Sequence, residues 1–349
     1  MKITKISFLL IMRSLIAEYL RLMRFPGAAT TAMPLLFGAL SVNVTSFSIL
    51  APLFIIGVLS GIYGFVFNDY IDAEIDALSP DLSKRRLATG TISKNAAKSI
   101  IIGCFCAVYI LVFVFFYRNH ILFFSGLACL IGADILGAIH NIFGKHLIGT
   151  DFLLALAHSL FLLFGAFIVI KEGKPGVLTW IFFVLIFCQL VYDNAILGGI
   201  KDAGHDILYK VKNIALASGV RVHSDKTIII PFCFQFFSFG VRFLSVVIIF
   251  VPFMLNILSY TIWLLLVLFI LGILLVFTNI HLVTLKTFNR PYVRRLILLQ
   301  EILWYPAISL LFIPLVGVFP TLLLIMLPGG WYIFFSIAIG GKIFEPILI

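Results

Sequence analysis

Nine long apolar runs constrain the fold of this chain more than any other feature of its sequence. A helix needs about 20 predominantly apolar residues to cross the hydrocarbon core of a bilayer. Runs of that kind lie near residues 26–47, 49–67, 98–117, 121–143, 151–170, 177–199, 228–250, 256–280 and 297–318. They do not alternate between apolar and polar positions, as the strands of a membrane barrel do. The prediction is an all-α polytopic membrane protein, a bundle of about nine transmembrane helices around a central cavity.

Composition agrees with this prediction. Hydrophobic residues make up 62% of the 349 residues and charged residues only 11%, whereas a soluble domain carries about 25% charge. A soluble core cannot hide this much apolar surface, so lipid is the expected solvent. The net charge of +10 is therefore expected to reflect basic residues in loops beside the bilayer, and no nucleic-acid partner is expected.

The two ends of the chain differ from the part that holds the nine runs. Residues 1–25 have only a short apolar run, which Arg13 interrupts, and this is typical of an amphipathic segment on the membrane surface. We expect residues 26–318 to form the main domain. Residues 319–349 form an apolar C-terminal extension, for which we expect an extra helix, a broken helix or a re-entrant tail because of Pro320, Pro328, Gly329 and Gly330.

The basic residues in the loops predict the orientation of the helices. With the N-terminus in the cytoplasm, the cytoplasmic segments hold 20 of the 25 lysine and arginine residues and the opposite segments hold 3. We therefore expect a multi-pass protein of the cell membrane. Its two longest loops, after the second and sixth runs, lie on the cytoplasmic side.

Acidic residues gather at the start of these two loops. Of the 15 acidic residues in the chain, nine lie in or beside residues 68–76 and 201–206. In the first stretch, Asp69, Asp72 and Asp76 follow a helical spacing of i, i+3 and i+7, and Asn68 lies four residues before Asp72. The three aspartates would thus share one face of a helix that continues past the membrane edge, and Asn68 would lie on the same face as Asp72.

The second stretch repeats the pattern, because Asp202 and Asp206 are four residues apart. Carboxylates on one face repel one another unless a cation lies between them, and sets of oxygen ligands favour hard cations such as Mg²⁺. The nearby basic residues favour a ligand with a diphosphate head and an apolar tail; they are Lys84, Arg85, Arg86, Lys201 and Lys210. The alternative is that these residues are solvated loop ends with no function.

These residues resemble motifs of the UbiA superfamily of intramembrane prenyltransferases. Residues 68–76 are similar to its first aspartate-rich motif, and residues 202–206 to its second. Arg21-x-x-Arg24-Phe25-Pro26 resembles the first helix of the family, and residues 89–93, after Lys84 and Arg85, resemble its segment before the third helix. The likeness extends over about residues 18–318. The chain departs from the family at Leu87, Lys210, Asn213 and His140, where the family usually has proline, glycine, threonine and tyrosine.

The resemblance implies Mg²⁺-dependent transfer of a prenyl group from a polyprenyl diphosphate to an acceptor, such as an aromatic ring or another lipid precursor, in the membrane. It implies that Mg²⁺ ions bridge the two motifs and hold the diphosphate. It assigns metal ligation to Asn68, Asp69, Asp72, Asp76, Asp202 and Asp206. Of these, it implies a catalytic role for Asp72, Asp76, Asp202 and Asp206. It assigns diphosphate contacts to Lys84, Arg85, Lys145 and Lys201.

Three other functions remain alternatives at this point. One is a related enzyme with altered chemistry, such as phosphoribosyl transfer to a polyprenyl phosphate. Another is an ion-coupled membrane transporter, although its charges would lie nearer the bilayer midplane. A CDP-alcohol phosphotransferase is the third, and its characteristic motif is absent. The sequence leaves open the roles of further polar residues within the runs, namely Asp134, His140, Asp151, His158 and Arg242.

Overall fold

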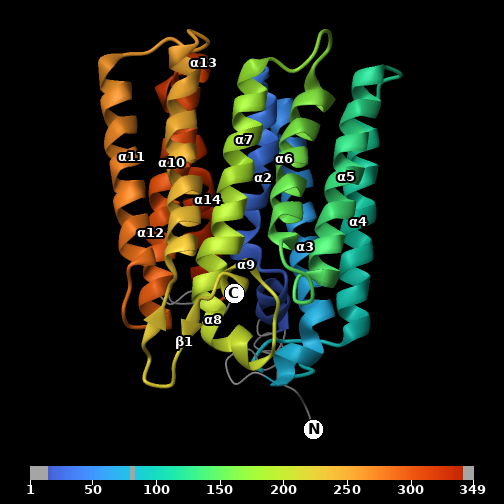
Figure 1. The fold of residues 1–349 in the computed structure, drawn as a ribbon. Helices are drawn as coiled ribbons and strands as arrows, with labels where there is room; N and C mark the ends of the chain where they lie inside the picture. The colour runs from blue at the N-terminus through green and yellow to red at the C-terminus, as the bar shows by residue number, and fades with distance from the viewer. Residues whose placement is uncertain (1–14, 79–82, 341–349) are drawn as a thin grey trace. The chain divides into compact units, whose positions relative to one another are not determined.

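The computed structural model describes residues 15–78 and 83–340, and Figure 1 shows their path. The fold is all-α, with a single short hairpin in this part of the chain that pairs Arg221–Val222 (β1) with Ile228–Ile229 (β2). Nine helical stretches among the described residues are long and apolar enough to cross a membrane. The predicted fold class is thus confirmed. Of the expected surface segment, residues 15–22 are helical and residues 1–14 lie outside the described part.

The chain divides into two compact units, which we describe separately. The first unit comprises residues 1–33, 47–118 and 326–349, and the second comprises residues 34–46 and 119–325. Two helices contribute to both units: α2 (Ala28–Ser41) and α14 (Val318–Ala338).

The first unit is built on two long helices that pack against each other, α3 (Phe47–Leu78) and α4 (Lys94–Phe116). A short 3-10 helix, Phe25–Gly27, leads into α2. The helix α4 begins where the Ser93 hydroxyl accepts a hydrogen bond from the Ala96 amide, which satisfies one of the free donors at a helix start. As the acidic spacing predicts, α3 does not end at the apolar boundary but continues through the whole of residues 68–76.

The helix α14 (Val318–Ala338) and the residue after it also contribute to the first unit. The Trp331 indole of α14 donates a hydrogen bond to the Phe25 carbonyl at 2.8 Å, and the Phe25 and Phe335 rings pack edge to face at 4.6 Å. Arg21 donates to the Ile339 carbonyl at 2.6 Å. The helix α14 runs through Pro328 without a break, because a transmembrane helix tolerates proline when neighbouring groups satisfy the freed backbone.

The second unit contains the remaining long helices. In order they are α5 (Ile121–Phe143), α6 (Thr150–Val169), α7 (Val177–Val191), a π-helix (Tyr192–Gly198), α8 (Gly199–Leu208), α9 (Ile214–Ala217), α10 (Phe232–Met254), α11 (Ile262–Val283), α12 (Arg290–Ser309), a 3-10 turn (Leu310–Phe312) and α13 (Ile313–Val316). The helices α5, α6 and α7 pack in sequence, and α10 packs between α7 and α11, which in turn packs against α12.

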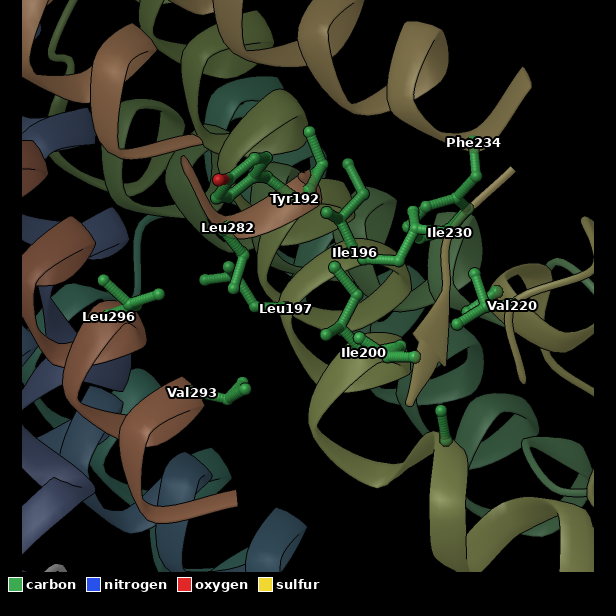
Figure 2. Packing of buried hydrophobic residues seen from close by; sticks show 14 residues of the cluster. Tyr192, Ile196, Leu197, Ile200, Val220, Ile230, Phe234, Leu282, Val293 and Leu296 are labelled. Atoms are coloured by element: carbon green, nitrogen blue, oxygen red, sulfur yellow. The ribbon is translucent and has the colours of Figure 1, made fainter. Parts of the chain in front are cut away.

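One apolar cluster surrounds the π-helix and α8, and Figure 2 shows its residues. Tyr192, Ile196 and Ile200 are each fully buried in it. They contact buried side chains of the hairpin region and of helices α10, α11 and α12, which include Val220, Ile230, Phe234, Leu282, Val293 and Leu296. Because residues of three later helices meet there, the position of α8 depends on the packing of the whole second unit.

The first predicted span, residues 26–47, is represented by a helix of only 14 residues, α2. The apolar run continues beyond Ser41, but Asn43 adopts a left-handed backbone with φ of 60°. Asparagine is one of the few residues that take this conformation readily, and the chain turns there. Hydropathy alone does not detect such a turn, so the prediction was too long at its C-terminal end.

Two glycines allow α2 and α6 to approach closely within the second unit. A Cβ atom on Gly165 would lie 2.3 Å from the Leu35 carbonyl oxygen, and one on Gly38 would lie 2.0 Å from that of Leu162. We expect Gly165→Ala to destabilise the protein by about 1–3 kcal/mol, the usual cost of overpacking. The measurement is the thermal unfolding midpoint in detergent.

The control for this prediction is Gly137→Ala in α5, where an added Cβ meets no atom within 4 Å. Because alanine stabilises a helix interior by up to about 1 kcal/mol relative to glycine, this variant should unfold at the wild-type temperature or above it. Equal unfolding midpoints for the two variants would contradict the predicted close contact.

Candidate active site

The first acidic stretch occupies the last turns of α3. Its carboxylates are buried although they are charged, with exposures of 6% for Asp69, 7% for Asp72 and 1% for Asp76. Buried carboxylates are stable only when they are paired, hydrogen-bonded or bound to a metal. Glu74 lies on another face of α3, is 86% exposed at its side chain and pairs with Lys94 at 2.9 Å.

Arg85 connects two of these buried carboxylates. Its Nη1 atom lies 2.6 Å from Asp76 Oδ2 and 3.2 Å from Asp69 Oδ1. Burial alone would lower the pKa of the Arg85 guanidinium, but the charges of Asp69 and Asp76 outweigh it and hold this pKa above its ordinary value. Arg85 is therefore a permanent cation within the acidic cluster. It also interacts electrostatically with Asp72.

A second arginine reaches the same cluster from the N-terminal side. Arg24 donates a hydrogen bond from Nη2 to Asp69 Oδ1 at 2.7 Å. Its backbone has a φ of 46°, a left-handed conformation that is uncommon for a residue other than glycine. The turn is held by the contact of Trp331 with the next residue, Phe25. The two arginines thus balance the charges of Asp69 and Asp76.

The loop that carries Arg85 has its own anchor. Arg86 donates to Glu18 Oε2 at 2.7 Å, and Arg21 pairs with the other oxygen of Glu18. Burial raises the pKa of the Glu18 carboxyl, but the hydrogen bond from Arg86 and the nearby arginine charges outweigh this effect and leave the pKa lowered. Arg86 therefore links the loop to the helical residues 15–22.

The second acidic stretch lies on α8, with Asp202 and Asp206 one turn apart as predicted. Asp202 accepts a hydrogen bond from Arg290 at 2.6 Å, and Lys201 Nζ lies 3.4 Å from its other oxygen. Arg290 is the first residue of α12, 88 positions away in the sequence. Arg290 lies close to Asp202 because α8 packs against α12.

Asp206 has a different set of neighbours. The Asn213 amide donates to Asp206 Oδ2 at 2.6 Å, and His205 Nδ1 lies 3.3 Å from Oδ1. Asp151, in the first turn of α6, interacts electrostatically with Asp206 and with His140. Asp151 is not the N-cap of α6, because Gly149 occupies that position. The second unit therefore gathers several polar groups around the second motif.

The predicted diphosphate contacts differ in their surroundings. Lys201 lies beside Asp202, and the backbone of Lys145 accepts a hydrogen bond from Lys212 at 3.0 Å, close after the second motif. Lys84 is exposed, and Arg85 is engaged with Asp69 and Asp76. His158, in contrast, is a partly buried residue of α6 whose ring hydrogen-bonds with the Leu154 carbonyl.

The polar groups in both stretches suit a hard cation. Asn68 and Asp72 are one helical turn apart on α3 and offer oxygen ligands. Among the described residues, no three carboxylate, imidazole or thiol groups lie close enough together to hold a metal ion. Mg²⁺ fits such a set, because it is usually bound through one or two carboxylates together with waters and substrate phosphates.

Sequence reasoning did not predict three of the neighbours of the acidic residues. Arg290 is not among the residues singled out from the sequence, and Asn213 is singled out only as a departure from the family pattern. The pairing of Arg24 with Asp69 spans 45 positions. A local signal exists only for Asn213, which precedes a short helix as an N-cap residue.

Within residues 15–78 and 83–340, nine helices are long and apolar enough to cross a membrane. The ends of α3 and α8 carry acidic side chains. These features define the class of polytopic helical membrane proteins. Residues 28–294 match the UbiA prenyltransferase family. Since this match covers most of the chain, the chain belongs to the UbiA prenyltransferase family and is a transferase of prenyl groups. A search of curated protein sequences gave no match.

Several solved structures share the fold. A structure of digeranylgeranylglyceryl phosphate synthase has a TM-score of 0.63 at 19% identity and covers 87% of this chain and 99% of its own. A UbiA homolog from Archaeoglobus fulgidus bound to DMAPP and Mg²⁺ has a TM-score of 0.57 at 15% identity, covering 84% and 99%. The apo UbiA homolog from Aeropyrum pernix K1 has a TM-score of 0.56 at 14% identity, covering 88% and 97%. At these identities the likeness concerns the fold.

Proposed function

We propose that this chain transfers a prenyl group from a polyprenyl diphosphate to an acceptor within the membrane and that the reaction requires Mg²⁺. The observation that carries this proposal is the arrangement of the first acidic cluster. Arg85 and Arg24 neutralise Asp69 and Asp76, while Asn68 and Asp72 offer oxygen ligands one turn apart on the same helix. Such a set suits a cation that also binds phosphate oxygens.

The reaction breaks the bond between the first prenyl carbon and the diphosphate oxygen. A bond to the acceptor nucleophile forms, and the acceptor loses a proton. When bound, Mg²⁺ supplies positive charge that stabilises the departing diphosphate. We propose that Asn68, Asp72, Asp202 and Asp206 bind the metal, and that Asp69 and Asp76 keep the end of α3 in place through Arg85.

Lysine and arginine residues near the acids would bind the diphosphate itself. We propose this role for Lys201, which lies beside Asp202, and for Lys84 and Lys145. Arg290 contacts Asp202 and so can either hold that carboxylate or contact phosphate oxygens. Arg85 acts mainly on Asp69 and Asp76. We further propose that these groups face the cytoplasm, as the loop charges indicate.

The test uses the full chain in proteoliposomes with labelled prenyl diphosphates of several lengths and a panel of aromatic and lipid-precursor acceptors. We expect a lipid-linked product in the presence of Mg²⁺ and none after chelation with EDTA. A product that is unaffected by chelation would contradict the metal requirement. If instead phosphoribosyl diphosphate and a polyprenyl phosphate yield the only product, the prenyl-transfer proposal is wrong.

A further inference from the structure

A buried polar cluster in the second unit lies apart from the two acidic motifs. Arg242 is its centre, and this arginine is fully buried in α10. Ten residues separate it from the start of α10 at Phe232, so it lies about 15 Å along the helix. A charge at this depth of a spanning helix is costly and indicates a function unless its partners are purely structural.

The neighbours of Arg242 come from three other elements. Its Nη1 donates to the Gln189 side-chain oxygen at 3.0 Å, and the guanidinium lies over the Tyr192 ring at 3.6 Å from the ring centre. Trp304 of α12 lies further away, at 5.5 Å. The Nε and Nη2 atoms have no hydrogen-bond partner. The faces of the Tyr192 and Trp304 rings instead stabilise the guanidinium through cation–π contacts.

Two carboxyl groups extend the cluster. The Gln189 side-chain nitrogen donates to Asp193 Oδ1 at 2.8 Å and lies 3.3 Å from Glu301 Oε1. Arg242 interacts electrostatically with both acids. One cation and two carboxyls are electrically balanced when the carboxyls share one proton. Gln189 thus links the arginine to the acids through both ends of its amide.

These contacts converge on the first two residues of the π-helix. Tyr192 and Asp193 open that segment, and the Tyr192 hydroxyl donates to Asn279 of α11 at 2.8 Å. The Asn194 side chain of this segment donates back to the Leu190 carbonyl of α7. A π-helix is rare and usually occurs as a single turn at a functional site, so the anchors at its start are informative.

The π-helix determines the direction in which α8 presents its side chains. One residue corresponds to about 100° of rotation in an α-helix, so inserting or removing the π turn rotates everything after it. The helix α8 follows without a break and carries both Asp202 and Asp206. Figure 2 shows Tyr192, Ile196 and Ile200 along this continuous stretch.

We infer that Arg242 is a positioning residue for the second motif. By holding Gln189 and Tyr192, it stabilises the π-helix in a register that places Asp202 beside Arg290. Without Arg242 the segment relaxes toward a regular α-helix, and Asp202 turns away from that contact. The expected consequence for catalysis rests on the proposed function, whereas the consequence for the π-helix does not.

The experiment compares the wild-type chain with Arg242→Met in the same detergent. We expect faster deuterium uptake in residues 192–208, measured by hydrogen exchange. We also expect the Mg²⁺ concentration for half-maximal transfer to rise about 10–100-fold, as occurs when groups that orient metal ligands are removed. Arg242→Lys keeps the buried charge and should show both changes at a smaller amplitude if Arg242→Met does not fold.

Gln300→Leu is the matched control. Gln300 is a fully buried residue of α12, and its amide donates to the Thr278 hydroxyl at 2.6 Å and to the Leu275 carbonyl at 3.2 Å, both in α11. Loss of these contacts should leave both uptake in residues 192–208 and the Mg²⁺ requirement at wild-type values. Wild-type values in a folded Arg242 variant, or equal changes in the control, would overturn the inference. If no donor is turned over at all, hydrogen exchange alone decides it.

Discussion

Replacing Arg85 with methionine will lower the free energy of unfolding by about 3–5 kcal/mol, the range found when one partner of a buried ion pair is removed. The variant leaves Asp69 and Asp76 buried without the guanidinium that contacts them both. Their side chains are only 8% and 1% exposed, so water cannot replace it. The measurement is thermal or chemical unfolding of the full chain in detergent.

Lys94→Met provides the comparison, because Lys94 also pairs with an acid of α3, Glu74. Both members of that pair are largely exposed, at 51% and 86%, and exposed pairs contribute at most about 1 kcal/mol. A double variant, Arg85→Met with Asp76→Asn, should recover part of the lost stability because it removes one uncompensated charge. If Arg85→Met and Lys94→Met lower the free energy of unfolding equally, Arg85 does not neutralise the buried carboxylates.

The second large effect concerns catalysis. We expect Asp72→Asn and Asp202→Asn each to reduce the rate of prenyl transfer by about 10²–10³, the loss typical of removing one group that stabilises developing charge. The substitution keeps the shape of the side chain but removes its charge, so it weakens the binding of a divalent cation. Higher Mg²⁺ concentrations should restore part of the rate, which radiolabelled product formation measures.

Each unit offers a matched control for this experiment. Glu74→Gln changes an exposed acid of the same helix as Asp72, and Asp225→Asn changes an exposed acid of the hairpin region. Both should transfer the prenyl group at the wild-type rate. A decrease in the controls equal to that in Asp72→Asn and Asp202→Asn would mean that net charge, rather than ligand position, matters.

Much of the fold is predictable from the sequence because the bilayer constrains it strongly. Apolar length identifies most of the helices that are long enough to span, although the run at residues 26–47 holds only the 14 residues of α2. The i, i+3, i+7 spacing correctly places residues 68–76 on a helix that continues past the apolar run. The sequence leaves open whether α14 is an extra helix, a broken helix or a re-entrant tail, because Pro328 and two following glycines are helix breakers in water. In a membrane the backbone is satisfied within the helix and by its neighbours, so these residues are tolerated.

The partners of the acids are less predictable. The pairing of Arg290 with Asp202 joins residues 88 positions apart, and no local pattern marks it. The π-helix is equally difficult to predict, because Tyr192–Gly198 lies within one apolar run of the sequence. Both features arise from packing among α8, α10, α11 and α12. Sequence periodicity reports which face of a helix is apolar, and it does not report which distant helix covers that face.

The participation of α14 in the first unit has a consequence for the biogenesis of the protein. The turn at Arg24, which supports Asp69, contacts Trp331 through Phe25. About 200 residues are translated between the end of α4 and this part of α14, which takes on the order of 10–40 s at bacterial or eukaryotic elongation rates. During that interval the acidic end of α3 lacks the support that Trp331 gives to the turn at Arg24. A nascent chain therefore acquires these contacts of the first unit only after α14 has been translated.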